Sequence, residues 1–182
     1  MRLSVSIMAA LSLLSIVLTA EADDKTRRQA LKVYAKKEFS ASKNHCQTFA
    51  KVAEHATTLT SKTGEWLEDM ALVIIGKDLV NRKNRGEYFH GVKTSDSGFK
   101  SELKDGSSQV EHAMAGIYLA KFVPGGSAFG GSIKEGYDAI KRNQSWSTQD
   151  ALLYAIAGDI GERLHDKELS RVGFPIRKTM CE

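Results

Sequence analysis

Apolar residues recur every three to four positions along most of the chain, the spacing that places them on one face of an α-helix. In the first half, this spacing predicts helices over about 25–39, 42–59 and 65–80. The segment over 109–123 is apolar nearly all round beyond its first turn, which is typical of a helix buried at the centre of a domain. The pattern therefore predicts an all-α fold built around this central helix.

Two helix starts are marked by a serine followed three positions later by an acid, the capping-box arrangement or its aspartate variant. They are Ser108 with Glu111, and Ser147 with Asp150. A last long helix is expected to follow the second start, and a shorter helix over 133–142 to lie between the two. Together, these elements predict a compact single-domain bundle of five or six helices.

The last long helix carries a stripe of mostly small residues at helical spacing: Ala151, Tyr154, Ala155, Gly158 and Gly161. Glycine costs nearly 1 kcal/mol in a helix interior, so two glycines indicate the close approach of another backbone. We expect this partner to be the small face of the central helix, around Ala113, Gly116 and Ala120. Such a crossing would place Asp150 and Tyr154 near His112. Asp159 and Arg163 are expected to form an ion pair on the outer face.

Two segments interrupt the helical pattern. Residues 81–107 have no sustained period and carry several glycines, which predicts a long irregular loop. Long irregular connections in a compact domain are often functional or mobile. Residues 123–132 contain a proline and four glycines, which predicts a second loop. This loop lacks the glycine spacing of phosphate-binding motifs, so phosphate binding is not indicated.

The first residues predict export. An apolar run over 3–18 follows Arg2 and ends at the small-x-small pattern Ala20-Glu21-Ala22, which is typical of a cleaved secretory signal. We therefore expect a signal peptide over 1–22 and a single helical domain over 23–182, secreted or periplasmic. The run is too short to be a typical membrane-spanning helix, and no later segment is long enough. About 160 of the 182 residues then remain, enough for a real core.

The two cysteines, Cys46 and Cys181, fit an oxidising compartment. A structural disulfide between them is favoured over a catalytic thiol, because neither cysteine lies in a recognisable nucleophile context. Closing so long a loop contributes on the order of 4 kcal/mol.

The net charge of +4 describes a weakly basic, mixed surface, which is not typical of a nucleic-acid-binding protein. Basic residues cluster in two places: Lys25, Arg27, Arg28, Lys32, Lys36 and Lys37 on the first helix, and Lys77, Arg82, Lys83 and Arg85 near the long loop. A solvated face is the favoured interpretation. The alternative is that the second cluster, with Tyr88 and Phe89, binds an anionic polymer or lipid surface.

The pair Glu111-His112 is the main candidate for chemistry. Glu111 has a structural role available, because it can reach back to the Ser108 amide and meets the positive end of the helix dipole. His112 begins a buried face, so it is either a core histidine with a satisfied hydrogen bond or a general base at the floor of a cleft. Both interpretations are open at this point.

Partners for a catalytic His112 are present nearby in the sequence. Glu111 or Glu102 could orient the imidazole, and Gln109 could donate a hydrogen bond to substrate or oxyanion. The further candidates for binding are Tyr88, Phe89, His90, Lys100 and Asp105. The same groups would equally fit a solvated loop with local salt bridges.

No HExxH, CxxC or GxSxG motif occurs, so zinc-protease, redox and α/β-hydrolase functions lose their usual support. No metal site and no cofactor is predicted. The leading hypothesis is a helical interaction protein that presents residues 82–107 to a protein, glycan or anionic envelope surface. The alternative is a small extracellular or cell-envelope hydrolase, acting on a glycan or lipid ester, with His112 as general acid or base beside a nearby carboxylate.

Overall fold

The computed structural model describes residues 24–76, 91–106, 108–121, 147–164 and 169–182. Within these ranges the chain forms six α-helices and no β-strand, which confirms the predicted all-α class. The first helix covers residues 24–41. The later elements, in chain order, are α2 (His45–Thr57), α3 (Thr63–Ile74), the 3₁₀ turn η1 (Ser101–Leu103), α4 (Gln109–Ala120), α6 (Thr148–Arg163), the 3₁₀ turn η2 (Leu169–Arg171) and α7 (Gly173–Met180).

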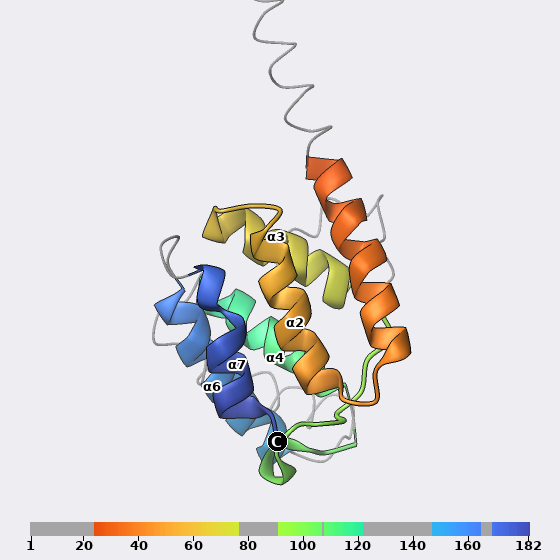
Figure 1. The fold of residues 1–182 in the computed structure, drawn as a ribbon. Helices are drawn as coiled ribbons and strands as arrows, with labels where there is room; N and C mark the ends of the chain where they lie inside the picture. Colours follow the sequence, from red (N-terminus) through yellow and green to blue (C-terminus); the bar gives the residue numbers. More distant parts are fainter. Residues whose placement is uncertain (1–23, 77–90, 107, 122–146, 165–168) are drawn as a thin grey trace, which may run out of the picture.

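Helix α4 lies at the centre of the described bundle, as its uniformly apolar sequence predicts. Figure 1 shows α2 between the 24–41 helix and α7, with α4 behind it. The side chains of Val110, Met114 and Ile117 on α4 are fully buried. They contribute to a hydrophobic core shared with the 24–41 helix, α2, α3, α6 and α7. Burying apolar surface stabilises a fold by about 25 cal/mol per Å², so these buried side chains help to hold α4 at the centre of the bundle.

Helices α4 and α6 cross at small residues, which confirms the predicted crossing. A Cβ atom placed on Gly116 of α4 would lie 2.6 Å from the Cβ atom of Ala157. A Cβ atom placed on Gly161 of α6 would lie 2.8 Å from the Cβ atom of Ala120 and would overlap the carbonyl oxygen of Ile117. Only glycine permits this approach, because any Cβ at these two positions would force the helices apart.

The carboxyl terminus is tied back to the amino-terminal half. Cys46 and Cys181 form the predicted disulfide, with their Cα atoms 5.5 Å apart. Cys181 also pairs with Phe99 in an isolated antiparallel bridge, and the Lys100 N–H donates to the carbonyl of Met180 at 2.9 Å. The described half of the predicted irregular loop, residues 91–106, therefore packs against the tail and is part of the folded body.

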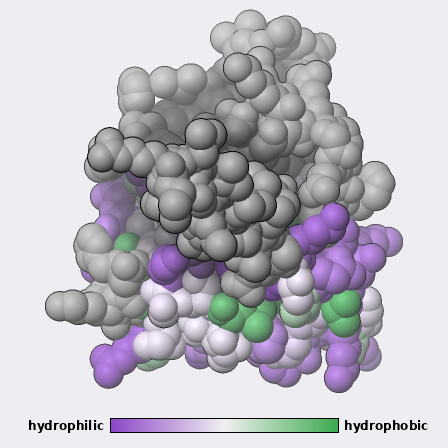
Figure 2. Space-filling view, turned by 90° about the horizontal axis from the view of Figure 1, so that it is seen from above, coloured by the Kyte–Doolittle hydropathy of each residue, from purple (hydrophilic) through white to green (hydrophobic). Residues whose placement is uncertain are grey.

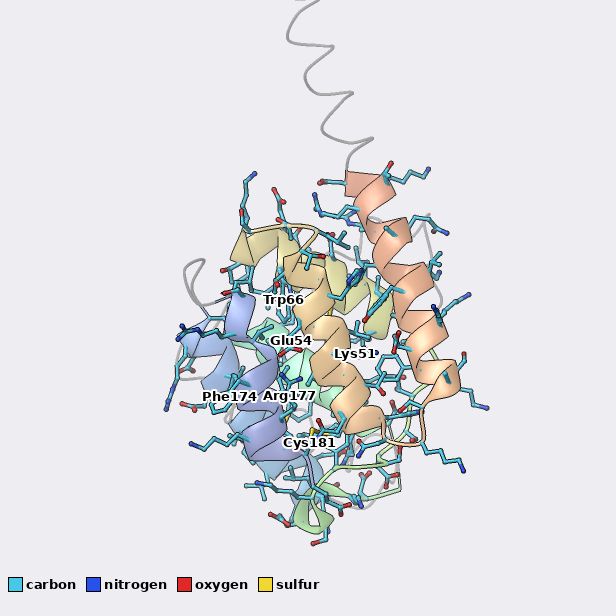
Figure 3. All side chains as sticks on the ribbon, in the orientation of Figure 1. Lys51, Glu54, Trp66, Phe174, Arg177 and Cys181 are labelled. Carbon is cyan, nitrogen blue, oxygen red and sulfur yellow. A yellow bond between two sulfur atoms is a disulfide. The ribbon has the colours of Figure 1, made fainter. Side chains whose placement is uncertain are left out.

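The sequence pattern missed helix α7. It is only eight residues long and contains Pro175 in its first turn, where the missing N–H would have no intrahelical acceptor. Ile176 and Met180 face the core and are fully buried. Arg177 forms an ion pair with Glu54 of α2, whose side chain points toward it (Figure 3). Tertiary contacts and the neighbouring disulfide therefore hold a segment that lacks a strong helical pattern.

One predicted cap is confirmed and the other is wrong. The Ser147 hydroxyl accepts a hydrogen bond from the Asp150 N–H at 3.0 Å, as expected at the start of α6. Ser108 stands at the start of α4 but makes no side-chain cap, because its hydroxyl hydrogen-bonds the hydroxyl of Thr94. The predicted loop over 123–132 and helix over 133–142 lie outside the described residues.

No helix within the described ranges is long and apolar enough to cross a membrane. Seen from above, the described surface is mainly hydrophilic, and its hydrophobic residues appear as small separate patches (Figure 2). The large hydrophobic side chains exposed on the described surface are Val33, Leu152 and Phe174, which belong to three different helices.

Candidate functional site

The crossing of α4 and α6 brings the first turns of both helices together. His112 lies in the first turn of α4, and Asp150 lies in the first turn of α6 next to its serine cap. The Nδ1 atom of His112 is 2.8 Å from Oδ1 of Asp150. The ring of Tyr154, one turn further along α6, has its centroid 5.9 Å from that of the imidazole. The predicted proximity of these three residues is therefore confirmed.

Gln109 is a second partner of the same imidazole nitrogen. Its Oε1 atom lies 3.0 Å from Nδ1 of His112, one helical turn away. Its Nε2 atom donates a hydrogen bond to the carbonyl oxygen of Leu103 in η1. A carbonyl oxygen can only accept, so the Leu103 contact requires the amide nitrogen on that side and leaves the amide oxygen facing His112. The side chain of Gln109 is fully buried, which holds this orientation.

These contacts determine the tautomer of His112. Both partners of Nδ1, the Asp150 carboxylate and the Gln109 amide oxygen, are acceptors. Nδ1 must therefore carry the hydrogen, and in the neutral ring Nε2 then holds the lone pair. Within the described residues, the hydrogen bonds of this imidazole are all made through Nδ1. Neither Asp150 nor Gln109 therefore occupies Nε2, the basic nitrogen of the neutral ring.

The His112–Asp150 pair differs from an ordinary surface pair in how deeply its carboxylate is buried. Asp150 is 5% exposed, whereas the His112 side chain is 24% exposed. A buried carboxylate behind a partly accessible imidazole fixes the ring and stabilises the imidazolium that forms when Nε2 accepts a proton. Nε2 of His112 can therefore act as a general base, while the Asp150 carboxylate at Nδ1 supplies the compensating charge. It can equally act as a hydrogen-bonding clamp between α4 and α6.

The carboxylate that contacts His112 is thus Asp150, whereas Glu102 or Glu111 was expected in this role from their closeness in the sequence. Glu102 is exposed in η1 and accepts a hydrogen bond from Ser101. Glu111 is half-buried in the first turn of α4. Within the described residues, neither glutamate hydrogen-bonds the imidazole. The sequence feature that pointed to Asp150 was the stripe of small residues on α6, which predicted the crossing with α4.

Some of the binding candidates lie within the described residues and others lie outside them. The Lys100 ammonium donates to the carbonyl oxygen of Lys178 at 3.1 Å, so it faces the tail. Asp105 is exposed and accepts a hydrogen bond from the Ser147 hydroxyl at 3.2 Å, which places it at the start of α6 near the His112 site. The remaining candidates lie outside the described residues: Tyr88, Phe89 and His90. No cluster of three metal-ligating side chains occurs in the described ranges.

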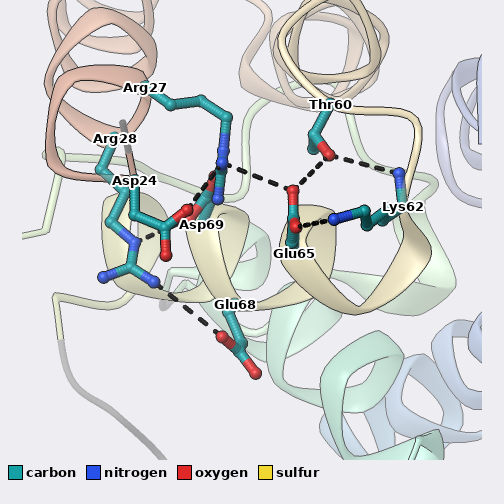
Figure 4. A network of polar contacts seen from close by, with 8 residues as sticks. All are labelled: Asp24, Arg27, Arg28, Thr60, Lys62, Glu65, Glu68 and Asp69. Atoms are coloured by element: carbon teal, nitrogen blue, oxygen red, sulfur yellow. Dashed lines mark hydrogen bonds and ion pairs between the residues drawn. The ribbon is translucent and has the colours of Figure 1, made fainter. Parts of the chain in front are cut away.

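A second polar cluster, shown in Figure 4, was missed by the sequence analysis. Asp69 of α3 is 2% exposed and binds two arginines of the 24–41 helix, with Arg27 Nε at 2.5 Å and Arg28 Nε at 2.7 Å. Arg27 also pairs with Asp24 at 2.8 Å. Burial alone would lower the pKa of Arg27, but its hydrogen bond and charge pairing with Asp69 raise that pKa above its ordinary value.

This cluster docks the first helix onto α3. Two of the six basic residues grouped on the first helix therefore turn inward, which corrects the expectation of a fully solvated basic face. The sequence signal was Asp69 itself, an acid within the apolar run of α3. A buried carboxylate needs a cationic partner, but the spacing of the sequence does not name which of the many cations supplies it.

Comparisons of the chain with protein families, curated proteins and solved structures found no match.

Proposed function

We propose that this chain is an exported hydrolase in which His112 acts as the general base. The observation that supports it is the pair of acceptors at Nδ1, Asp150 at 2.8 Å and Gln109 at 3.0 Å. A base must be oriented by a third group and must keep its reactive nitrogen free of that group. Asp150 and Gln109 both contact the same nitrogen, so they orient the ring without occupying Nε2.

The bond that this arrangement suits best is an ester of a lipid or of an acylated glycan. Glycosidic bonds are usually cleaved by two carboxyl groups that flank the substrate. Within the described residues, the carboxylate at the imidazole is Asp150, and it is committed to Nδ1. An imidazole base acting on water is instead the chemistry of acyl-ester hydrolysis.

In the proposed step, Nε2 of His112 takes a proton from water while the water oxygen attacks the ester carbonyl carbon. The resulting imidazolium is stabilised by the Asp150 carboxylate, which stays ionised. When the tetrahedral intermediate collapses, the bond to the alcohol oxygen breaks and Nε2 returns its proton to that oxygen. The products are a carboxylic acid and an alcohol, and the enzyme is regenerated without a covalent intermediate.

The test uses the purified chain without residues 1–22, assayed on p-nitrophenyl butyrate, a phospholipid and an O-acetylated glycan. General-base catalysis contributes about 100- to 10,000-fold, so His112→Gln is expected to lower kcat by that factor on whichever ester is cleaved. Asp150→Asn is expected to lower kcat by at least about 100-fold, because the imidazolium loses its compensating charge.

The matched control is His55→Gln. His55 is also half-buried, but it stacks on the ring of Tyr34 with centroids 3.7 Å apart and belongs to α2. This variant is expected to keep full activity. Circular dichroism of all variants checks that helix content is retained. Hydrolysis by His112→Gln at the wild-type rate would contradict the proposal, as would the absence of ester hydrolysis by the folded wild-type chain.

If the chain folds but hydrolyses no ester, the alternative is that it is an interaction protein. Residues 91–106 pack against the tail and against α2, where the Cys46 N–H donates to the carbonyl of Ser97 at 3.0 Å. A docking surface on this loop would therefore rest mainly on Tyr88, Phe89 and His90, outside the described residues. Deleting residues 82–90 and measuring partner capture from envelope material tests that hypothesis.

A further inference from the structure

A short segment of the chain lies between the disulfide and the His112 site. It covers residues 97–106 and includes the 3₁₀ turn η1, and we call it the strap. Figure 1 shows it in green beside the carboxyl terminus. At its first residue, the Ser97 carbonyl accepts a hydrogen bond from the N–H of Cys46 at 3.0 Å. The strap therefore begins next to the disulfide.

Two backbone hydrogen bonds fix the strap to the tail of the chain. The Glu182 N–H donates to the carbonyl of Gly98 at 2.9 Å. The Lys100 N–H donates to the carbonyl of Met180 at 2.9 Å. Cys181 lies between these two tail residues and is bonded to α2 through the disulfide. The disulfide therefore holds the tail, and the tail holds the strap.

The strap contacts Gln109 directly. Nε2 of Gln109 donates a hydrogen bond to the carbonyl oxygen of Leu103 in η1. Oε1 of the same amide lies 3.0 Å from Nδ1 of His112. The side chains of Leu103 and Gln109 are both fully buried, so water does not compete for this amide. The position of the Leu103 carbonyl therefore decides which way the Gln109 amide faces.

The strap reaches Asp150 through one intermediate residue. The Ser147 hydroxyl donates to the carboxylate of Asp105 at 3.2 Å and accepts from the Asp150 N–H at 3.0 Å. Asp105 is exposed, so water competes for this contact and it is the weaker of the two links. Both acceptors at Nδ1 of His112 therefore lie one or two hydrogen bonds from the strap.

We propose that the strap positions the imidazole of His112 and that the disulfide holds the strap in place. The inference rests on the proposed function of His112 as a general base. With the disulfide formed, the Leu103 carbonyl is fixed and holds Gln109 against Nδ1. Without the disulfide, the tail releases the strap and the imidazole loses its fixed orientation. Leu103 is thus a positioning residue, since it acts on His112 through Gln109.

Activity then depends on oxidation of the two cysteines. The thiols of Cys46 and Cys181 give two electrons and two protons to a disulfide oxidant R–S–S–R, which leaves as two R–SH thiols. The side chains of both cysteines are buried, so the bond is shielded from exchange once it has formed. The site is therefore completed in a compartment where disulfides form, which suits an exported hydrolase.

The test compares the chain lacking residues 1–22 with its double variant Cys46→Ala and Cys181→Ala, both shown to be folded by circular dichroism. The long-range ¹H–¹⁵N spectrum of the His112 imidazole is expected to show Nδ1 protonated in the wild type and a mixture of both neutral tautomers in the double variant. A base that is misplaced by about 1 Å costs about 100-fold, so kcat for p-nitrophenyl butyrate is expected to fall by about that factor.

Asp69→Asn is the matched control for a general loss of stability. Asp69 lies on α3 in the cluster of Figure 4, and its partners are arginines of the 24–41 helix. Its replacement is expected to destabilise the chain about as much as loss of the disulfide does. This variant is expected to keep the His112 tautomer and the kcat of the wild type. The same change at His112 in both variants would mean that the strap has no specific role.

Gln109→Met tests the link with the disulfide intact, in case the cysteine variant does not fold. Methionine fills a similar space but provides no amide for Leu103 or His112. This variant is expected to lower kcat by about 10- to 100-fold. In its background, removing the disulfide is expected to lower kcat by a smaller factor than in the wild type, because the link is already broken. Independent, multiplying effects of the two changes would overturn the inference.

Failure of this inference and failure of the proposed function give different results. A folded wild type that hydrolyses no ester contradicts the hydrolase, but the His112 tautomer can still be compared with and without the disulfide. An identical tautomer in the wild type and in the folded double variant would show that the strap does not position the imidazole, whatever the activity.

Discussion

Adding one methyl group at Gly161 tests the helix crossing on which the candidate site depends. In Gly161→Ala, the new Cβ would lie 2.8 Å from the Cβ of Ala120 and would overlap the backbone carbonyl of Ile117. Ordinary contacts of this kind lie several tenths of an ångström further apart, and neither neighbour is the end of a flexible side chain. Helices α4 and α6 must therefore move apart.

The expected magnitude combines two opposed effects. Overpacking a well-packed interface costs about 1–3 kcal/mol, and contact with rigid backbone indicates the upper end, about 3 kcal/mol. Alanine has a better helix propensity than glycine by about 1 kcal/mol, which offsets part of this cost. The net loss of stability is about 2 kcal/mol. For a chain of this length, such a loss lowers the melting temperature by about 4–8 °C.

The assay is thermal and urea unfolding followed by circular dichroism, with Gly64→Ala as the matched control. Gly64 lies in the first turn of α3, and a Cβ there would meet only the Nζ atom of Lys121, at 3.3 Å. That control is expected to be neutral or more stable by up to about 1 kcal/mol. If Gly161→Ala is as stable as Gly64→Ala, the two helices do not cross as described.

Three further results are expected. Reducing the Cys46–Cys181 bond, which spans 135 residues, is expected to lower the free energy of unfolding by about 4–5 kcal/mol, measured by urea unfolding with and without reductant. Asp69→Asn is expected to cost about 3–5 kcal/mol, because two arginines lose their buried counter-charge. The pKa of Glu65 is lowered, and the largest cause is its hydrogen bond with Lys62. The ionised Glu65 therefore stabilises the folded chain above its ordinary pKa of 4.5, and this stabilisation is lost as the pH falls through the lower pKa of the folded state. Glu65→Gln is therefore expected to reduce the loss of stability in acid, measured by urea unfolding at several pH values.

Each of these results has a specific contradiction. An unchanged urea midpoint in reductant would contradict the stabilising role of the disulfide. A loss below about 0.5 kcal/mol in Asp69→Asn would be typical of an exposed pair such as Asp159–Arg163, which lies on the outer face of α6. An acid limb of the stability curve that is identical in Glu65→Gln would mean that this carboxylate has the same pKa in the folded and unfolded chains.

Much of the fold could be predicted because it follows from local patterns. Helical periodicity located the 24–41 helix, α2, α3 and α4, and the small stripe of α6 identified its partner. The predicted crossing also placed Asp150 near His112, because both residues lie in the first turns of the two helices that cross. The disulfide was expected from the predicted oxidising compartment and from the presence of only two cysteines.

The remainder depends on contacts between distant segments. Nothing in the spacing of the chain shows that Asp69 faces the arginines of the first helix, because many cations could supply its partner. Helix α7 lacks a strong period and is held by Ile176, Met180 and the disulfide. Glu102 and Glu111 are closer to His112 in sequence than Asp150, but the direction of their side chains depends on tertiary packing. Proximity along the chain was therefore a poor guide to which carboxylate binds the imidazole.

The most direct test of the candidate site is the tautomer of His112, read from a long-range ¹H–¹⁵N correlation spectrum at neutral pH and assigned with His112→Gln. The contacts with Asp150 and Gln109 predict a proton on Nδ1 and a bare, basic Nε2. A proton on Nε2 in the neutral ring would contradict the geometry at Nδ1 and, with it, the role of His112 as a base.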